Sequence, residues 1–481
     1  MKTLLLSIAL FAGLVGLSAQ VPDRSKPPVV GPAPALRLPE IHKRQLSNGL
    51  PVWIVELHEV PVAQVNLVVR GGTTDDPSGK FGVASLMTAM LTEGAGSRSG
   101  LEVADAVDFL GADLGANSGF DSMTVRLHVP VARLGEALPI MADVALRPAF
   151  PQPELERLRQ QRLTTLIQSR DDAATIAGLA FARVLFPGTR FGTAAMGTEA
   201  SITSFTVGDL RAFYAERFVA SASTLVVVGD VHPDQVMPLL ERSFGTWRGT
   251  PTPAGGVSGV TGSATSAPRA TRRIYLVDKP GAPQSQIRIG AIGVARATPD
   301  YFPIQVMNTI LGGSFSSRLN MNLREQHGYT YGASSSFDMR VRPGPFVAAA
   351  GVQTDKTSES LTEFFKELTG ILQPVPSDEL SRAKNYVALR FPGGFETTGD
   401  ISRRLEDALV YRLPDDYFTK YVPGIEAVRE ADVQRVARTY IRPDSLAIVI
   451  VGDRKVIEPG INALNLGPIT LMTVEEIFGE K

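Results

Sequence analysis

A short segment in the first half of the chain has the spacing of a metal-binding helix but lacks residues that bind metal. GVASLMTAMLTEGAG, residues 82–96, has the pattern of a short amphipathic helix closed by glycine. Ser85, Thr88 and Ala89 occupy positions i, i+3 and i+4 on its polar face. Zinc requires imidazole, thiolate or carboxylate ligands, so two hydroxyls and a methyl group cannot hold it. The segment is predicted to be a helix without a metal site.

Other catalytic patterns are also missing from the sequence. The absence of cysteine excludes thiolate nucleophiles and cysteine-based zinc sites. No G-x-S-x-G nucleophile elbow occurs, and the adjacent carboxylates Asp75–Asp76 and Asp171–Asp172 are interpreted as solvated turn and cap residues. No pair at i, i+3 or i+4 exists among the five histidines, which are His42, His58, His128, His232 and His327. We therefore expect no metal or other cofactor in this chain.

A second candidate segment, LREQHGYTYGASS, lies in the second half of the chain. Arg324 and Tyr331 are seven residues apart across a helix end marked by Gly328, and Tyr329 is an alternative to Tyr331. An arginine near a helix C-terminus and a tyrosine at a strand start also occur for dipole and packing reasons. The residues alone leave a structural and a functional interpretation open.

The composition is that of a globular protein with a large core. The chain has 481 residues, of which 44% are hydrophobic, and 48 basic residues nearly balance 49 acidic ones. No charged block indicates binding to nucleic acid or to a membrane surface. The N-terminus has Lys2, an apolar run over residues 4–17, and small residues at Ser18 and Ala19. Residues 1–19 are predicted to be a signal peptide too short to span a membrane, which predicts a periplasmic or secreted protein.

The mature chain divides into two similar parts. A proline-rich lead-in, residues 20–40, precedes an N-terminal lobe, residues 41–248, and a Gly/Ser/Thr/Pro-rich linker, residues 249–272, precedes a C-terminal lobe, residues 273–481. STLVVVGD and SLAIVIVGD end with Gly-Asp pairs 223 residues apart, at Gly229–Asp230 and Gly452–Asp453. VAQVNLVVRGG and SQIRIGAIGV, which begin at Val62 and Ser285, also correspond. The chain is predicted to contain two copies of one unit.

Strand and helix patterns within each unit define the fold class. DSMTVRLHVP, residues 121–130, alternates like a strand, and PELERLRQQRLTTLIQSR, residues 153–170, has helical periodicity. Strands and helices do not alternate strictly along the chain. We predict an α+β fold of two homologous lobes, each a mostly antiparallel sheet with helices packed on one face.

Four segments together resemble a known family. They are LSNGLPVWI, GKFGVASLMTAML, ERFVASASTLVVVGDV and ILGGSFSSRLNMNLREQHGYTYG, and the resemblance runs from about Leu46 to Ile457. In this order they resemble the insulysin/pitrilysin peptidases and the mitochondrial processing peptidases, whose inverted zinc motif is H-x-x-E-H. By position, the two motif histidines fall on Ser85 and Ala89, and the catalytic glutamate falls on Thr88. The third ligand, a glutamate, falls on or beside Thr165, so all four zinc-site residues are missing.

The resemblance implies roles for residues that remain. In the family, an arginine and a tyrosine at the positions of Arg324 and Tyr331 project toward the zinc centre. The arginine binds substrate oxygens and the tyrosine hydroxyl donates to the scissile carbonyl. GADLGANSGFDS corresponds to an edge strand that pairs with extended peptide, so Ala116, Asn117 and Ser118 are implied to bind substrate through main-chain hydrogen bonds.

The resemblance finally implies a function in a complex. Family members without the motif occur as partners of a zinc-bearing homologous subunit. We expect a non-catalytic subunit of a heterodimeric zinc metallopeptidase, with zinc held by the partner and peptide enclosed between the subunits. The alternative is a stand-alone peptide-binding or assembly protein with no proteolytic role.

Overall fold

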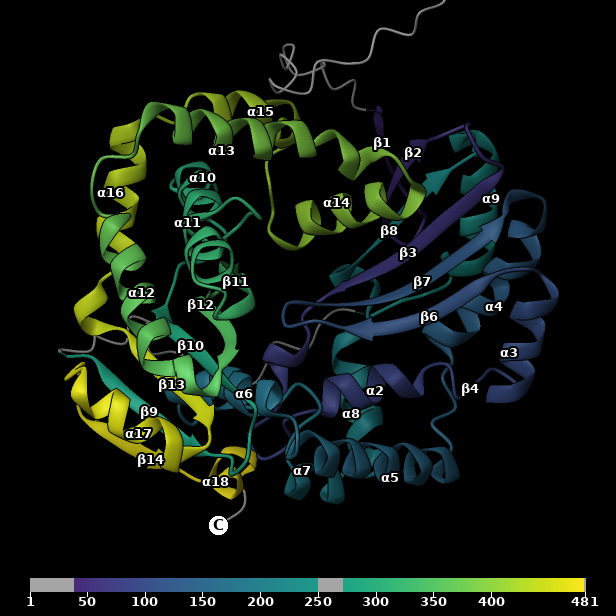
Figure 1. Cartoon of the computed structure of the whole chain (residues 1–481). Coiled ribbons are helices and arrows are strands. Elements are labelled where there is room, and N and C mark those ends of the chain that lie inside the picture. The colour runs from purple at the N-terminus through teal and green to yellow at the C-terminus, as the bar shows by residue number, and fades with distance from the viewer. Residues whose placement is uncertain (1–38, 250–270, 480–481) are drawn as a thin grey trace, which may run out of the picture. The chain divides into compact units, whose positions relative to one another are not determined.

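The structure is a computed structural model that describes residues 39–249 and 271–479. The predicted signal peptide, most of the lead-in and most of the linker lie outside the described residues. Each described stretch contains one six-stranded sheet (Figure 1). Two short strands, β4 (Gly94–Ala95) and β5 (Arg98–Ser99), form a separate hairpin.

The first sheet has the strand order β1-β2-β8-β3-β7-β6. Its strands are β1 (Ile41–Gln45), β2 (Pro51–Glu56), β3 (Val62–Arg70), β6 (Asp113–Ser118), β7 (Ser122–Pro130) and β8 (Ser223–Gly229). Only β2 and β8 pair in parallel, and the other neighbours are antiparallel. The strand pattern read in residues 62–72 and 121–130 corresponds to β3 and β7.

The second sheet repeats this topology, with the order β14-β9-β13-β10-β12-β11. Its strands are β9 (Arg273–Asp278), β10 (Gln284–Ile292), β11 (Thr330–Met339), β12 (Pro343–Gln353), β13 (Ala447–Gly452) and β14 (Ile469–Met472). β9 and β13 are parallel, as are their counterparts β2 and β8, although β14 joins β9 in parallel where β1 joins β2 antiparallel. The predicted α+β fold with two homologous, mostly antiparallel lobes is confirmed.

Helices fill the connections between the strands in both lobes. In the first lobe they are α2 (Val83–Met90), α3 (Gly100–Phe109), α4 (Leu134–Leu146), α5 (Gln152–Ser169), α6 (Ala173–Leu185), α7 (Glu199–Ser204), α8 (Val207–Arg217) and α9 (Pro233–Phe244). In the second they are α10 (Tyr301–Leu311), α11 (Arg318–Asn320), α12 (Thr357–Gly370), α13 (Ser377–Arg390), α14 (Thr398–Val410), α15 (Tyr417–Glu426), α16 (Glu430–Tyr440), α17 (Arg454–Ala463) and α18 (Val474–Phe478). The helix predicted over residues 153–170 is α5.

One helix from each lobe packs on the sheet of the other lobe. α6 contacts β10 and β13 of the second sheet, and its counterpart α14 contacts β3 and β8 of the first (Figure 1). Val226 and Val228 of β8 accordingly belong to the hydrophobic core formed by the second lobe. Every residue of β8 is therefore buried, as expected for a strand covered on both faces. This exchange fixes the two lobes to each other through apolar contacts.

Within residues 39–249 and 271–479, no helix is long and apolar enough to cross a lipid bilayer.

Candidate functional site

A buried ion pair fixes the start of α2, the helix with the motif spacing. Asp76 accepts hydrogen bonds from the backbone amides of Gly82 (2.6 Å) and Ala84 (2.9 Å) and from Nε of Arg190 (2.7 Å). Burial raises the pKa of the Asp76 carboxyl, and the Arg190 guanidinium and the two amides oppose that rise. Asp76 is only 4% exposed. The interpretation of Asp76 as a cap is confirmed, but its interpretation as solvated is wrong, because the α2 amides and Arg190 enclose it.

The motif positions on α2 make contacts that leave no ligand set. Ser85 Oγ accepts a hydrogen bond from Nη2 of Arg162 on α5, at 3.0 Å. Thr88 is buried and donates its hydroxyl to the carbonyl of Ala84, one turn earlier in the same helix (2.7 Å). Thr165 likewise donates to a carbonyl of its own helix, that of Gln161 (2.9 Å). These residues do not fit a zinc ion, because each hydroxyl is neutral and two of them bond to their own backbone.

Arg162 brings a positive charge to the position where α5 meets α2. Besides its bond to Ser85 of α2, the side chain makes a second, longer bond from Nη1 to the carbonyl of Met196 (3.4 Å). Burial lowers the pKa of the guanidinium to about 10, and the charge of Asp76 opposes the decrease, so Arg162 remains charged at neutral pH. A fixed cation beside Ser85 repels a metal ion. Sequence analysis missed this residue, although it lies one helical turn before Thr165 on α5.

Restoring the motif alone is expected to produce weak zinc binding at most. The variant Ser85→His, Thr88→Glu, Ala89→His still lacks a third ligand at position 165 and retains the Arg162 charge. Adding Thr165→Glu and Arg162→Gln is expected to increase zinc affinity by about 10–100-fold over the triple variant. Competition with a chromophoric zinc chelator measures both affinities, with the unaltered chain as background. Equal affinity of the two variants would contradict both the need for a ligand at position 165 and the opposing effect of the Arg162 charge.

The candidate peptide-binding strand is an edge strand in the structure. Among the strands that the structure describes, β6 is the last of its sheet and pairs only with β7, where Ala116 lies opposite Val125 and Ser118 opposite Met123. Asn117 is exposed, and its two neighbours are half-buried. An edge strand has unpaired backbone groups that an extended peptide can bind. The backbone of residues 116–118 therefore has the geometry for strand addition.

Arg324 lies on an irregular helical turn. It belongs to η5 (Met321–Gln326), a π-helical segment that follows α11, and π-turns occur preferentially at functional sites. The Arg324 side chain is 41% exposed and pairs with Glu325 at 3.3 Å. Its guanidinium lies 4.8 Å from the ring centre of Phe315, which is itself exposed. Neither contact buries the guanidinium, so it remains available to a ligand.

Tyr331 stands on a β-bulge at the start of β11, the edge strand of the second sheet. The register advances three residues on β11, from Thr330 to Ala333, but only two on β12, from Val352 to Ala350. The Thr330 hydroxyl holds the bulge by donating to the carbonyl of Gly351 (2.7 Å) and accepting from the amide of Gly332 (3.1 Å). Tyr331 is 89% exposed. Bulges beside active sites change the direction of a side chain, and this one directs a tyrosine into solvent.

The two candidate tyrosines differ in their surroundings. Tyr329 is half-buried and its ring stacks on His327, with ring centres 4.9 Å apart. Tyr331 makes no hydrogen bond through its hydroxyl to any residue that the structure describes. The structure therefore favours Tyr331 over Tyr329 as the residue free to contact a ligand. In the described residues, no hydrogen bond or ion pair joins Arg324 or Tyr331 to α2 or α5.

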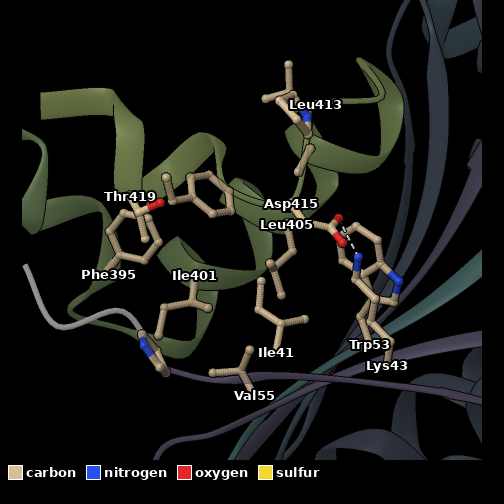
Figure 2. Close-up of a pocket in the computed structure, with 14 residues that line it drawn as sticks. Ile41, Lys43, Trp53, Val55, Phe395, Ile401, Leu405, Leu413, Asp415 and Thr419 are labelled. Atoms are coloured by element: carbon tan, nitrogen blue, oxygen red, sulfur yellow. Dashed lines mark hydrogen bonds and ion pairs between the residues drawn. The ribbon is translucent and has the colours of Figure 1, made fainter. Parts of the chain in front are cut away.

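A separate apolar cavity lies between β1, β2 and the helices α14 and α15 (Figure 2). It measures about 390 Å³ and is lined by side chains such as those of Trp53, Phe395, Ile401 and Leu405. Lys43 pairs with Asp415 across its rim at 2.5 Å. The lining is mostly apolar, and its two charged side chains, Lys43 and Asp415, pair with each other, so the cavity does not have the composition of an active site.

Three of the five histidines lie together around Glu56, an arrangement that their spacing along the sequence did not predict. The Glu56 carboxylate lies 3.3 Å from a ring nitrogen of His42, 3.1 Å from one of His58 and 2.7 Å from one of His232. These residues are far apart in sequence, but Glu56 ends β2 and His232 follows the end of the parallel strand β8. The hydrogen bond to Asp230 raises the pKa of His58, and the bond with His232 lowers the pKa of Glu56. The only indication of this cluster in the sequence was a repeated acidic-x-His pattern at two strand ends, Glu56-Leu57-His58 and Asp230-Val231-His232.

Comparison with known proteins identifies the class that this fold and site define. Residues 52–179 match the family described as Insulinase (Peptidase family M16), and residues 204–387 match the description Peptidase M16 inactive domain. A Peptidase M16 inactive domain from Pseudomonas fluorescens has a similar structure, with a TM-score of 0.77, 25% identity, and coverage of 86% of this chain and 98% of that one. The two lobes thus have the fold of zinc peptidases and their inactive relatives.

The relatives in sequence include proteins named as zinc proteases and one named as a non-peptidase homolog. An uncharacterized zinc protease of Mycobacterium leprae is 25% identical over 74% of this chain and 78% of its own length. The non-peptidase homolog YmxG of Helicobacter pylori is 24% identical over 86% of this chain and 94% of its own length. The chain belongs to the M16 peptidase family, and it lacks the family's zinc-binding motif.

Proposed function

We propose that this chain is the non-catalytic subunit of a heterodimeric zinc metallopeptidase. In this complex it binds peptide and supplies Arg324 and Tyr331 to the zinc site of a homologous partner. The observation that carries the proposal is the exposure of Tyr331 on a β-bulge, beside a strand edge, in a chain that lacks zinc ligands at the family's motif positions. An aromatic side chain that is 89% exposed contributes little to the core of its own lobe.

The chemistry of the two side chains suits roles in a partner's site. A phenol hydroxyl can donate to the oxyanion that forms when metal-bound water attacks a peptide carbonyl. The Arg324 guanidinium can hold a substrate carbonyl or carboxylate through two hydrogen bonds. The open edge of β6 can align an extended peptide through its backbone. The non-peptidase homolog among the relatives is consistent with a chain that does not cleave peptides alone.

Reconstitution tests the proposal directly. The chain is mixed with an M16 homologue from the same organism that retains H-x-x-E-H, and cleavage of a quenched fluorescent peptide is measured for each chain alone and for the mixture. We expect activity mainly in the mixture, together with a heterodimer by light scattering. Binding of peptide by this chain without any gain in activity would support the stand-alone peptide-binding role instead.

We also propose that the chain acts outside the cytoplasm, in the periplasm or as a secreted protein. The basic start and short apolar run of residues 1–19 have the composition of a cleaved signal peptide. Mass spectrometry of the protein from its native host is expected to find a mature N-terminus near residue 20. Recovery of intact Met1 in the cytoplasmic fraction would contradict this localisation.

A further inference from the structure

The cluster at the ends of β2 and β8 has the composition of a metal site distinct from α2. Glu56, His58 and His232 each offer one ligand atom, and these atoms all lie within 4.8 Å of one another. One carboxylate oxygen of Glu56 lies 3.1 Å from Nε2 of His58 and 2.7 Å from Nδ1 of His232. Ligands at 2.0–2.1 Å from a tetrahedral zinc ion are about 3.3 Å apart, so small side-chain movements accommodate an ion.

The surroundings of the cluster orient its ligands for a metal. His58 Nδ1 lies 2.7 Å from a carboxylate oxygen of Asp230. A proton on Nδ1 in this bond leaves the Nε2 lone pair directed at Glu56, which is the carboxylate–histidine–metal arrangement of many zinc proteins. His42 Nε2 lies 3.3 Å from the second oxygen of Glu56 and restrains that carboxylate from the other side. The ligands are therefore held by neighbours that do not themselves need to bind the ion.

The fold alone does not explain why histidines gather here, because the second lobe provides an internal comparison. At the equivalent strand ends, Asp278 closes β9 and Asp453 follows β13, but no histidine accompanies them. Asp453 accepts from the backbone amides of Lys455 (3.1 Å) and Gly281 (2.8 Å), and Asp278 accepts from the amide of Arg454 (3.1 Å). The carboxylates of the second lobe thus serve as helix and turn caps. In the first lobe, the same positions point carboxylates at imidazoles.

We propose that Glu56, His58 and His232 bind one divalent transition-metal ion, with zinc the expected occupant, and that Asp230 is a positioning residue for His58. Two imidazoles and one carboxylate match the donor preference of zinc and its neighbours, whereas Mg²⁺ and Ca²⁺ prefer sites made of oxygen. The side chains of His58 and His232 are 46% and 58% exposed, so an ion reaches the site from solvent. Because the ligands come from the ends of two adjacent parallel strands, the ion would join β2 to β8 as a structural clip.

The test uses the mature chain without a histidine tag, after treatment with a chelator. Calorimetric titration with Zn²⁺ is expected to show one site per chain, and Co²⁺ is expected to give a visible absorption spectrum of a nitrogen- and oxygen-ligated ion. His58→Ala and His232→Ala are each expected to abolish this binding. Asp230→Asn is expected to weaken zinc binding by about 10–100-fold, as is typical when a carboxylate that hydrogen-bonds to a metal-bound histidine is lost. Saturating Zn²⁺ is expected to raise the melting temperature of the unaltered chain but not of His58→Ala.

His327→Ala is the matched control, because it removes an exposed histidine outside the cluster. It is expected to bind Zn²⁺ as the unaltered chain does, and circular dichroism verifies that every variant is folded. Absence of a zinc site in the unaltered chain, or equal binding by the His58→Ala/His232→Ala double variant, would overturn the inference. Because the site does not include Arg324 or Tyr331, these results are independent of the proposed role in a peptidase complex.

Discussion

Asp76→Ala is expected to lower the free energy of unfolding by about 3–5 kcal/mol, the loss typical of removing one partner from a buried ion pair. The change leaves the Arg190 guanidinium, which is 4% exposed, without its carboxylate. It also removes the acceptor for two amides at the start of α2. Urea denaturation followed by circular dichroism measures the loss.

Asp171→Ala is the matched control for this prediction. Asp171 also pairs with a basic residue, Lys279, at 3.3 Å, but its side chain is 89% exposed. Exposed ion pairs contribute little to stability, so this variant is expected to unfold at nearly the same urea concentration as the unaltered chain. Similar losses for Asp76→Ala and Asp171→Ala would mean that burial of the Asp76–Arg190 pair does not determine its contribution.

The strand pattern of the sequence predicted the strands because the pattern of apolar residues in each strand follows which of its faces are buried. β7 alternates, and β8 and β13 are continuous apolar runs that end in Gly-Asp. The repeated Gly-Asp pairs predicted a duplication, and the structure shows that the two sheets have a common strand order. What the patterns could not predict was the cover on the second face. A continuous apolar run shows that both faces are buried, but not that α6 or α14 of the other lobe buries one of them.

The candidate site was predictable only in part, for a similar reason. The absence of zinc ligands at Ser85, Thr88 and Ala89 is evident from the sequence, since residue type alone decides whether a side chain can bind zinc. The position of Arg162 depends on how α5 packs on α2, and the cluster at Glu56 depends on the parallel pairing of β2 with β8. The spacing of residues along the chain predicts neither the packing of α5 on α2 nor the pairing of β2 with β8. The bulge at Tyr331 likewise follows from a register difference between two strands.

The largest effect on activity is expected for Tyr331→Phe in the complex with a zinc-bearing partner. Loss of one oxyanion donor lowers peptide cleavage by about 100–1000-fold. The decrease should fall mainly on kcat, because the hydrogen bond strengthens as negative charge develops in the transition state. The fold of this chain should be unaffected, since the Tyr331 hydroxyl has no hydrogen-bond partner in the part of the chain that the structure describes, and the complex is expected to form as before. Steady-state kinetics and light scattering on the same samples measure the two properties.

Tyr329→Phe separates this role from a general effect of altering the segment. Tyr329 lies two residues away but is half-buried against His327, so the loss of its hydroxyl is expected to leave cleavage near the unaltered rate. Arg324→Ala should instead raise KM as well as lower kcat, because a guanidinium that holds the substrate acts in the ground state too. If Tyr331→Phe and Arg324→Ala form the complex and cleave at the unaltered rate, neither side chain enters the partner's site. The stand-alone peptide-binding or assembly role would then replace the proposed role in a peptidase complex.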